Sequence, residues 1–222
     1  MEITQKMFAK MRHPRRGKAN PERIYNPVWK FMVQNKESAS WARLHFETPG
    51  SPVWSFDRFG MSETILSDGR VIYIAGEHED YYDSDFYIYN DVIIIHPDGE
   101  IAIYGYKEAV FPPTDFHSAT RINNHIYIIG RAGYWDERIL SFTPVYRLNC
   151  DSLEIERLVT SGDYPGWISN HEAKFDEPNN KILIQSGKLV PEDDAAKYED
   201  NFQAYQLDLA TLTWQKVESP RE

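Results

Sequence analysis

The segment FGMSETILSDGRVIYIAG, at residues 59–76, combines a short entry strand, a polar turn, an apolar strand and a closing glycine. The same arrangement recurs in DFHSATRINNHIYIIG at 115–130 and in SNHEAKFDEPNNKILIQSG at 169–187. The closing glycines follow one another at intervals of 54 and 57 residues, and they are Gly76, Gly130 and Gly187. An internal period of this length indicates a repeat architecture, in which each repeat buries its apolar face against its neighbours.

A second hairpin follows each of these segments. Two apolar runs flank a polar turn in YNDVIIIHPDGEIAIYGY at 89–106, in PVYRLNCDSLEIERLV at 144–159 and in FQAYQLDLATLTWQKV at 202–217. This pattern is typical of a β-hairpin, so each repeat predicts four short strands. Connectors that contain proline lie between the repeats. We do not assign them as strands, because proline is excluded from central strands. We place the three repeats at residues 54–106, 111–159 and 165–217.

Three features of these repeats are shared with a known family. They are the entry at Pro113–Thr120, the IYIIG strand at 126–130 and Trp214 in the last strand. In these features the chain resembles a kelch-repeat β-propeller over residues 41–218. The resemblance implies an all-β fold, with kelch-like four-stranded blades forming a partial propeller of about three blades. The alternative is an ordinary antiparallel sheet protein whose periodicity is coincidental.

Two departures from the family pattern are evident. Kelch repeats usually carry a glycine doublet, whereas each closing glycine here is followed by a charged residue, and only the third repeat has a tryptophan in its last strand. Propellers of this family usually close at six or seven blades. Three blades leave three arrangements open: a homodimer that completes a six-bladed ring, an open arc capped by the N-terminal segment, or the surviving part of a longer propeller.

Residues 1–40 predict a basic arm with a short helix. NPVWKFMVQNKES at 26–38 predicts that helix, because Asn26 can cap it and Pro27 suits its first turn. Residues 3–12 predict a further turn or two of helix, and residues 12–24 predict a flexible basic linker. WARLHF at 41–46 predicts a lone fourth strand ahead of the first complete repeat.

Charge is distributed unevenly along the chain. Residues 1–36 carry nine Lys or Arg and two Glu, whereas residues 37–222 carry 15 basic and 32 acidic side chains. The acidic body disfavours nucleic acid and anionic membranes as partners and suits a basic one. No apolar run reaches the length of a membrane span. The single cysteine, Cys150, allows no intrachain disulfide, so we expect a reducing, cytoplasmic location.

No compact catalytic motif is present, and we expect no catalytic, cofactor or metal residues. The acidic run at 77–85 lacks the spacing and the glycine of an EF-hand loop, so it predicts a solvated loop. His117 and His171 occupy equivalent repeat positions, where the resemblance implies a structural role. Galactose oxidase shares this architecture and uses copper with a Tyr–Cys cofactor, for which Cys150 has no evident tyrosine partner. A kelch-like enzyme that acts on a sugar acid stays open, because such enzymes use dispersed polar residues.

Long loops between the second and third strands of each repeat predict a partner-binding face, together with the connectors. Aromatic side chains among carboxylates suit a protein interface with a basic partner. The predicted contact residues are Trp54, Asp80, Tyr82, Asp83, Asp85, Tyr134, Trp135, Asp136, Trp167, Asp193 and Tyr198. The alternative for Trp54 and Trp167 is packing between neighbouring repeats, and for the carboxylates it is solubility. The sequence therefore predicts a non-catalytic protein-binding module, and its charge also suits an immunity-type binder of a basic toxin.

Overall fold

The computed structural model describes residues 2–48, 52–78 and 85–218, and it is mostly β with three short α-helices. The chain divides into two compact units, Met1–Pro113 (unit 1) and Thr114–Glu222 (unit 2). The all-β expectation is confirmed at this level. None of the described helices has the length and apolarity that crossing a bilayer requires.

Unit 1 begins with the three helices, α1 (Gln5–Met11), α2 (Pro27–Asn35) and α3 (Ala39–His45). The predicted helix at 26–38 is confirmed as α2, because Asn26 Oδ1 accepts hydrogen bonds from the amides of Val28 and Trp29. This is the N-cap arrangement that the sequence indicated. The further turn predicted within residues 3–12 is confirmed as α1.

The prediction of a strand at 41–46 is wrong, because these residues form most of α3. Ser38 caps this helix by accepting a hydrogen bond from the amide of Trp41 at 3.1 Å. Ala39, Ala42 and Phe46 are buried at a spacing that lies along one helix face. The six residues 41–46 did not reveal this helical spacing, because their alternating apolar residues are also typical of a strand.

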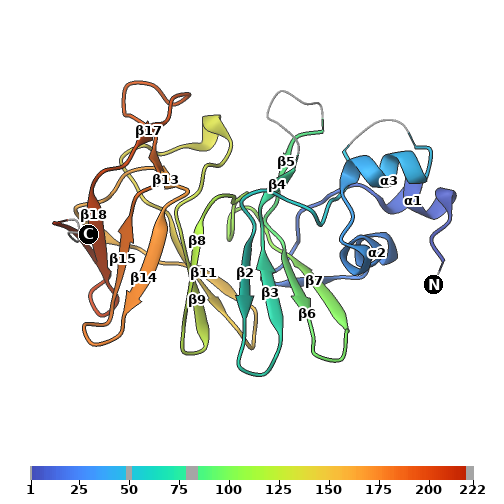
Figure 1. The fold of residues 1–222 in the computed structure, drawn as a ribbon, viewed down its shortest axis with the longest axis horizontal. Coiled ribbons are helices and arrows are strands. Elements are labelled where there is room, and N and C mark those ends of the chain that lie inside the picture. The colour runs from blue at the N-terminus through green and yellow to red at the C-terminus, as the bar shows by residue number, and fades with distance from the viewer. Residues whose placement is uncertain (1, 49–51, 79–84, 219–222) are drawn as a thin grey trace. The chain divides into compact units, whose positions relative to one another are not determined.

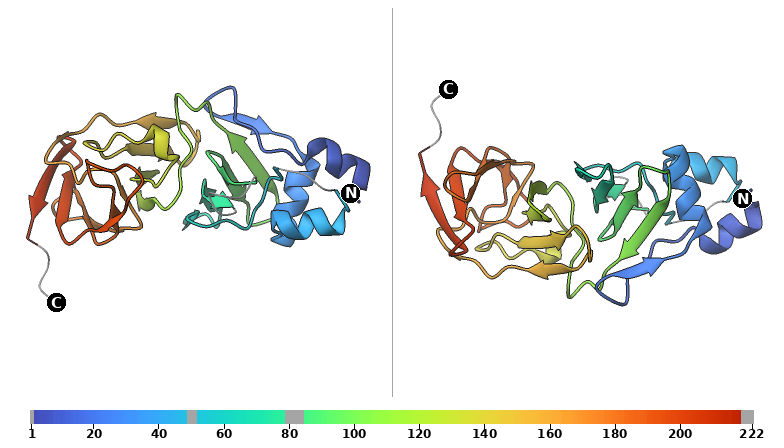
Figure 2. Two further views of the ribbon diagram at one scale, coloured as in Figure 1. Left: turned by 90° about the horizontal axis from the view of Figure 1, so that it is seen from above. Right: turned by 90° about the horizontal axis from the view of Figure 1, so that it is seen from below.

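The prediction of a flexible linker at 12–24 is also wrong. Its last three residues form strand β1 (Glu22–Ile24), which pairs antiparallel with β7 (Ile101–Gly105). Arg16 donates hydrogen bonds to the Glu108 carboxylate and to the Ile88 carbonyl. Gly17 approaches Gly105 so closely that a Cβ on Gly17 would lie 2.1 Å from the carbonyl carbon. The basic arm therefore folds back on unit 1, and Figure 2 shows blue β1 beside green β7.

Sheet 1 of unit 1 is an antiparallel meander with β1 added at its outer edge, in the order β1-β7-β6-β3-β2. Its other strands are β2 (Ser62–Ile65), β3 (Val71–Ile74) and β6 (Val92–Ile95). The short strands β4 (Glu77–His78) and β5 (Tyr87–Ile88) pair separately. One face of sheet 1, with Ile93 and Ile103, shares a core with Trp29 and Met32 of α2 and Phe46 after α3. The helices therefore cover that face.

Unit 2 contains two four-stranded antiparallel meanders. Sheet 2 has the order β11-β10-β9-β8, and sheet 3 has the order β19-β18-β15-β14 with β12 added beside β19. Their bounds are β8 (Ser118–Ile122), β9 (His125–Ile129), β10 (Val145–Asn149), β11 (Ile155–Arg157), β12 (Ser161–Gly162), β14 (Glu172–Asp176), β15 (Lys181–Gln185), β18 (Ala204–Asp208) and β19 (Thr213–Val217).

Sheets 2 and 3 bury their facing sides in one core, and their first strands, β8 and β14, are neighbours. Sheet 2 contributes Ile129 and Val145 to this core, and sheet 3 contributes Ile184, Leu207 and Trp214. Neither sheet could keep this face from water alone. The sequence expectation that one repeat packs on the next therefore holds within unit 2 (Figure 1).

The three meanders share their left-handed backbone positions as well as their strand order. Positive φ angles recur before the entry strand, in the first hairpin turn, at the closing glycine and in the second hairpin turn. These positions are Gly60, Phe116 and Asn170; Gly69, Asn123 and Asn180; Gly76, Gly130 and Gly187; and Gly99, Leu153 and Leu212. Because left-handed residues are uncommon outside glycine, four such matches show that the three sheets share a backbone pattern as well as a strand order.

The side of sheet 3 that faces away from the shared core is polar. Gln206 and Gln215 lie opposite each other on this side and are joined by a 3.1 Å hydrogen bond. Lys174 lies in the same row, and Leu183 between them is only half-buried. The two sides of sheet 3 therefore differ, with apolar residues on the side that faces sheet 2 and polar residues on the other.

Candidate functional site

Two long loops meet at one end of unit 2. They are residues 131–143, between β9 and β10, and residues 188–201, between β15 and β18, and we call them together the loop face. A small sheet holds them: β13 (Ile168–Ser169) pairs with β16 (Lys188–Leu189), which pairs with β17 (Glu199–Asp200). Figure 1 shows β13 and β17 at the upper end of the unit, away from the β14–β15 hairpin turn.

Arg138 joins the two loops. Its Nε donates to the Ala132 carbonyl at 3.1 Å within its own loop, and its Nη1 donates to the Ala195 carbonyl at 2.5 Å across the face. Its Nη2 also donates to the Tyr198 hydroxyl, and its Cζ lies 4.8 Å from the centroid of the Tyr198 ring. The predicted contact residues of both loops therefore lie on one surface.

Trp135 projects the largest apolar surface on this face. It begins the 3-10 helix η1 (Trp135–Glu137), and 68% of the residue is exposed. Tyr134, which precedes it, is half-buried, whereas Asp136 and Asp193 are exposed and Tyr198 is 44% exposed. Four of the five predicted contact residues in these loops are thus exposed, and an exposed tryptophan is a typical interface anchor.

The loop face carries an excess of negative charge. Its two loops contain seven carboxylates and four cations. Three of the cations form ion pairs, Arg131 with Glu137, Lys188 with Asp200 and Lys197 with Asp194. The fourth, Arg138, is bound by carbonyls and Tyr198. In the part of the chain that the structure describes, four loop carboxylates therefore pair with no cation: Asp136, Glu192, Asp193 and Glu199.

A cavity of about 330 Å³ lies at the base of these loops. Leu140, Tyr164, Pro165 and Leu189 supply apolar walls, and Glu192 and Glu199 supply carboxylates. The lining comes from both loops and from the connector before β13, so the small sheet and Arg138 shape it.

The corresponding loop of unit 1 is described only in part. The predicted contact residues Asp80, Tyr82 and Asp83 lie outside the described residues. Asp85 is fully buried and forms an ion pair with Arg43 of α3. It therefore fastens the loop to a helix and is not part of an exposed acidic surface.

Trp54 is 1% exposed and belongs to the interior of unit 1. Its ring stacks on Trp29 with centroids 5.0 Å apart, and its Nε1 donates to Asp91. Arg58 lies 3.3 Å from the centroid of the Tyr89 ring and also donates to Asp91. Burial raises the pKa of the Tyr89 hydroxyl well above its usual value. Trp54 is therefore a packing residue and not part of a contact surface.

Trp167 has a similar role in unit 2, where it is 2% exposed. Its Nε1 donates to the Ala132 carbonyl at 2.9 Å, and Arg131 lies 5.0 Å from the ring centroid. Trp167 thus contacts Arg131 and Ala132, the first two residues of the loop face, from the interior of unit 2. The alternative of packing between neighbouring repeats therefore describes Trp167, which contacts Ala132 of the preceding repeat, whereas Trp54 packs on Trp29 of α2.

His117 and His171, which were expected to be structural, are both buried in unit 2. The Nε2 atom of His171 lies 2.8 Å from the Ser118 hydroxyl. Burial lowers the pKa of His117 to about 3, with the proximity of His171 as a second cause, and burial lowers the pKa of His171 to about 4. Both imidazoles are therefore neutral near pH 7, as expected of buried histidines in a core.

Among the described residues, no group of three or more His, Cys, Asp or Glu side chains is placed to hold a metal ion. The geometry of the loop face can supply apolar contact, carboxylates and backbone groups, which are the components of a binding surface.

Four residues that shape this site were not predicted from the sequence: Arg138, Leu140, Tyr164 and Glu199. Arg138 and Leu140 lie within the predicted loop 131–143, and Glu199 lies within 188–201. No local pattern marks Arg138, because Ala195 and Tyr198, with which it forms hydrogen bonds, belong to the other loop. No local pattern marks Tyr164, because only the fold brings its connector beside the loops.

No family model matches the chain, and no curated protein matches it either. Among solved structures that resemble it is the structure of YjhT, with 18% sequence identity and a TM-score of 0.45. The match covers 78% of this chain and 54% of that one, so the chain spans about half the length of YjhT. A similarity at this level carries no argument, and the assignment of the site depends on the geometry of the chain itself.

Proposed function

We propose that this chain is a non-catalytic, kelch-like repeat protein that binds another protein through its loop face. The observation that carries the proposal is Trp135, which is 68% exposed in a loop that Arg138 joins to the second, carboxylate-rich loop. Tryptophan buries a large area at a small entropic cost, and the surrounding carboxylates favour a partner with a basic surface. A basic toxin is one such partner.

We further propose that the three meanders are kelch-like blades and that the chain is a monomer. Two observations support a monomer over a homodimer that completes a ring. The helices bury one face of sheet 1, and sheet 3 turns Gln206 and Gln215 away from its core. Repeat arrays end in repeats that are covered or polar on the outside, because an apolar end would associate. The buried single cysteine, Cys150, suits the expected cytoplasmic location.

The test is quantitative capture of partners from the source cells with immobilised protein. We expect the double variant Trp135→Ala/Asp136→Ala to lose the proteins that the unchanged chain enriches. The matched control is Leu44→Ala/Glu47→Ala, which removes an exposed apolar residue and an exposed carboxylate from unit 1. The control should keep these proteins, and both variants should keep the circular-dichroism melt of the unchanged chain. Equal enrichment by the Trp135/Asp136 variant and the unchanged chain would rule out the loop face.

A further inference from the structure

The cavity at the base of the loop face combines apolar walls with uncompensated negative charge. Its volume is about 330 Å³, and the apolar part consists of Leu140, Tyr164, Pro165 and Leu189. Pro165 is buried and the other three are half-buried, so the walls are accessible from the solvent side. Glu192 and Glu199 also line the cavity, and both residues are exposed.

Neither of these two carboxylates is neutralised within the part of the chain that the structure describes. The nearby cations are engaged elsewhere: the Lys188 Nζ lies 2.6 Å from Asp200, and the Lys197 Nζ lies 3.3 Å from Asp194. Arg138 directs its donors at carbonyls and at Tyr198. Two carboxylates that share one cavity and have no counter-ion attract a cation from outside.

We propose that this cavity receives the side chain of an arginine or lysine from a flexible basic segment of the partner protein. This inference rests on the proposed function and specifies its partner. The aliphatic stem of such a side chain can pack on Leu140 and Leu189, while its charged end lies at Glu192 and Glu199. The volume is at the lower limit of sites for drug-sized ligands, which suits a single long side chain.

Trp135 can contact a part of the partner's segment outside the one basic side chain. Trp135 and Leu140 belong to the same loop, and Arg138 between them fixes that loop to residues 195 and 198 of the other. A segment whose basic side chain enters the cavity therefore has an exposed aromatic ring close by in the same loop. Aromatic and arginine contacts of this kind dominate the binding energy of many protein interfaces.

The experiment is a fluorescence-anisotropy titration of a labelled arginine–glycine repeat peptide, with a glutamate–glycine peptide of equal length as the negative probe. The unchanged chain should bind the first and not the second at physiological ionic strength. We expect Glu192→Gln/Glu199→Gln to weaken the arginine peptide about tenfold or more, because charge-assisted contacts are lost.

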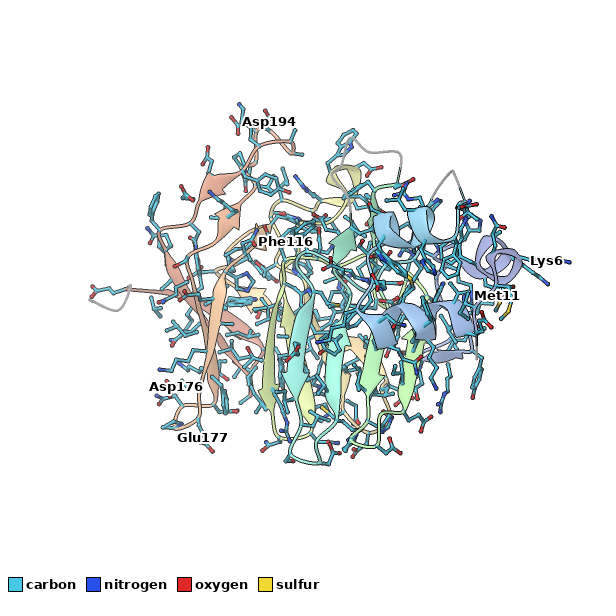
Figure 3. The ribbon with its side chains drawn as sticks, turned by 45° about the vertical axis from the view of Figure 1, so that its right-hand side comes forward. Lys6, Met11, Phe116, Asp176, Glu177 and Asp194 are labelled. Carbon is cyan, nitrogen blue, oxygen red and sulfur yellow. The ribbon has the colours of Figure 1, made fainter. Side chains whose placement is uncertain are left out.

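The matched control is Asp176→Asn/Glu177→Gln, which removes the same amount of charge from the β14–β15 turn. Figure 3 shows Asp176 and Glu177 at the opposite end of unit 2 from Asp194 of the loop face. The control should change the affinity less than twofold. Equal losses in both double variants would overturn the inference, because they would show attraction to the net charge alone.

A further variant separates this inference from the proposed function. If Trp135→Ala abolishes partner capture while Glu192→Gln/Glu199→Gln leaves both capture and peptide affinity intact, the cavity inference fails and the loop face stands. If neither variant changes capture, the proposed function itself fails. Should the unchanged chain bind neither peptide yet still capture a partner through Trp135, the partner is not held by a basic side chain.

Discussion

The indole Nε1 of Trp54 donates a 2.8 Å hydrogen bond to the Oδ2 atom of Asp91, inside unit 1. The same carboxylate accepts two hydrogen bonds from Arg58, at 2.6 Å and 3.1 Å. Arg58 also donates to the carbonyls of Ser55 and Ala75. Every donor in this network has an acceptor, which is the condition under which a buried ion pair can be tolerated.

Replacing Asp91 with Ala should therefore leave a buried guanidinium uncompensated and destabilise unit 1 by about 3–5 kcal/mol. The matched control is Glu100→Ala, which breaks the surface pair with Arg23, also 2.6 Å long but with side chains 39% and 50% exposed. That change should cost at most about 1 kcal/mol. Urea unfolding measures both, and similar costs for the two would contradict the role of the network.

The buried histidines should make unit 2 sensitive to acid. Their pKa values are lowered in the folded chain, to about 3 for His117 and about 4 for His171, from 6.5. Above pH 6.5 both histidines are neutral in the folded and in the unfolded chain, so the free energy of unfolding is at its full value. As the pH falls below 6.5, the histidines bind protons in the unfolded chain but not yet in the folded one, and the free energy of unfolding decreases. At about pH 5 each histidine should cost roughly 2 kcal/mol of stability relative to neutral pH.

The variant His117→Met tests this pH dependence, because Met61 stands at the equivalent position of the first repeat. Its free energy of unfolding should change less between pH 7 and 5 than that of the unchanged chain, by roughly 2 kcal/mol. A slope that His117→Met leaves unaltered would show that other groups cause the acid sensitivity.

The closing glycine of sheet 1 should tolerate no side chain. Gly76 has a φ of +90°, and a Cβ there would lie 2.8 Å from the Met61 Cβ and 2.9 Å from the Phe59 carbonyl oxygen. Gly99, in the same sheet, has a φ of +83° and open space around it. Gly76→Ala should therefore destabilise the unit by about 1–3 kcal/mol more than Gly99→Ala does. Comparable thermal shifts for the two variants would mean that the backbone relaxes and the close approach is unimportant.

The covered face of sheet 1 and the polar side of sheet 3 predict a monomer. Light scattering at micromolar concentration should give the mass of one chain, 26.0 kDa. Gln206→Leu/Gln215→Leu, on the polar side of sheet 3, would join Leu183 in an apolar patch and should promote association. A stable dimer of the unchanged chain would instead favour the six-bladed ring.

Local chemistry explains why much of the fold could be predicted from the sequence. The strands around Gly76, Gly130 and Gly187 were evident, because alternating apolar residues and turn residues act within a few positions. Asn26 predicted the start of α2 for a similar reason, because an N-cap acts on amides only two or three residues away. Residues 12–24 and 41–46 were misassigned, because a distant strand and a shared core determine their structure. Long-range contacts override local propensity in such segments.

The site was predicted only in part, for a similar reason. Trp135, Asp136 and Tyr198 could be named, since long loops with aromatic residues are frequent binding elements. The sequence left packing and partner contact open for Trp54 and Trp167, because their neighbours, Trp29 and Ala132, meet them only in the folded chain. The cavity could not be predicted from the sequence either, because its walls come from three separate segments of the chain.

The pairing of Glu22 with Gly105 has a consequence for how the protein is made. On the ribosome β1 emerges before its partner strand β7, which follows some eighty residues later, about 4–16 s at ordinary synthesis rates. Until then β1 has no edge to join, and the apolar sides of α1 and α2 lack the sheet that covers them. During that interval the apolar helix faces are exposed to water, and chaperones can bind them. The basic residues around β1 favour hydration of the unfolded segment.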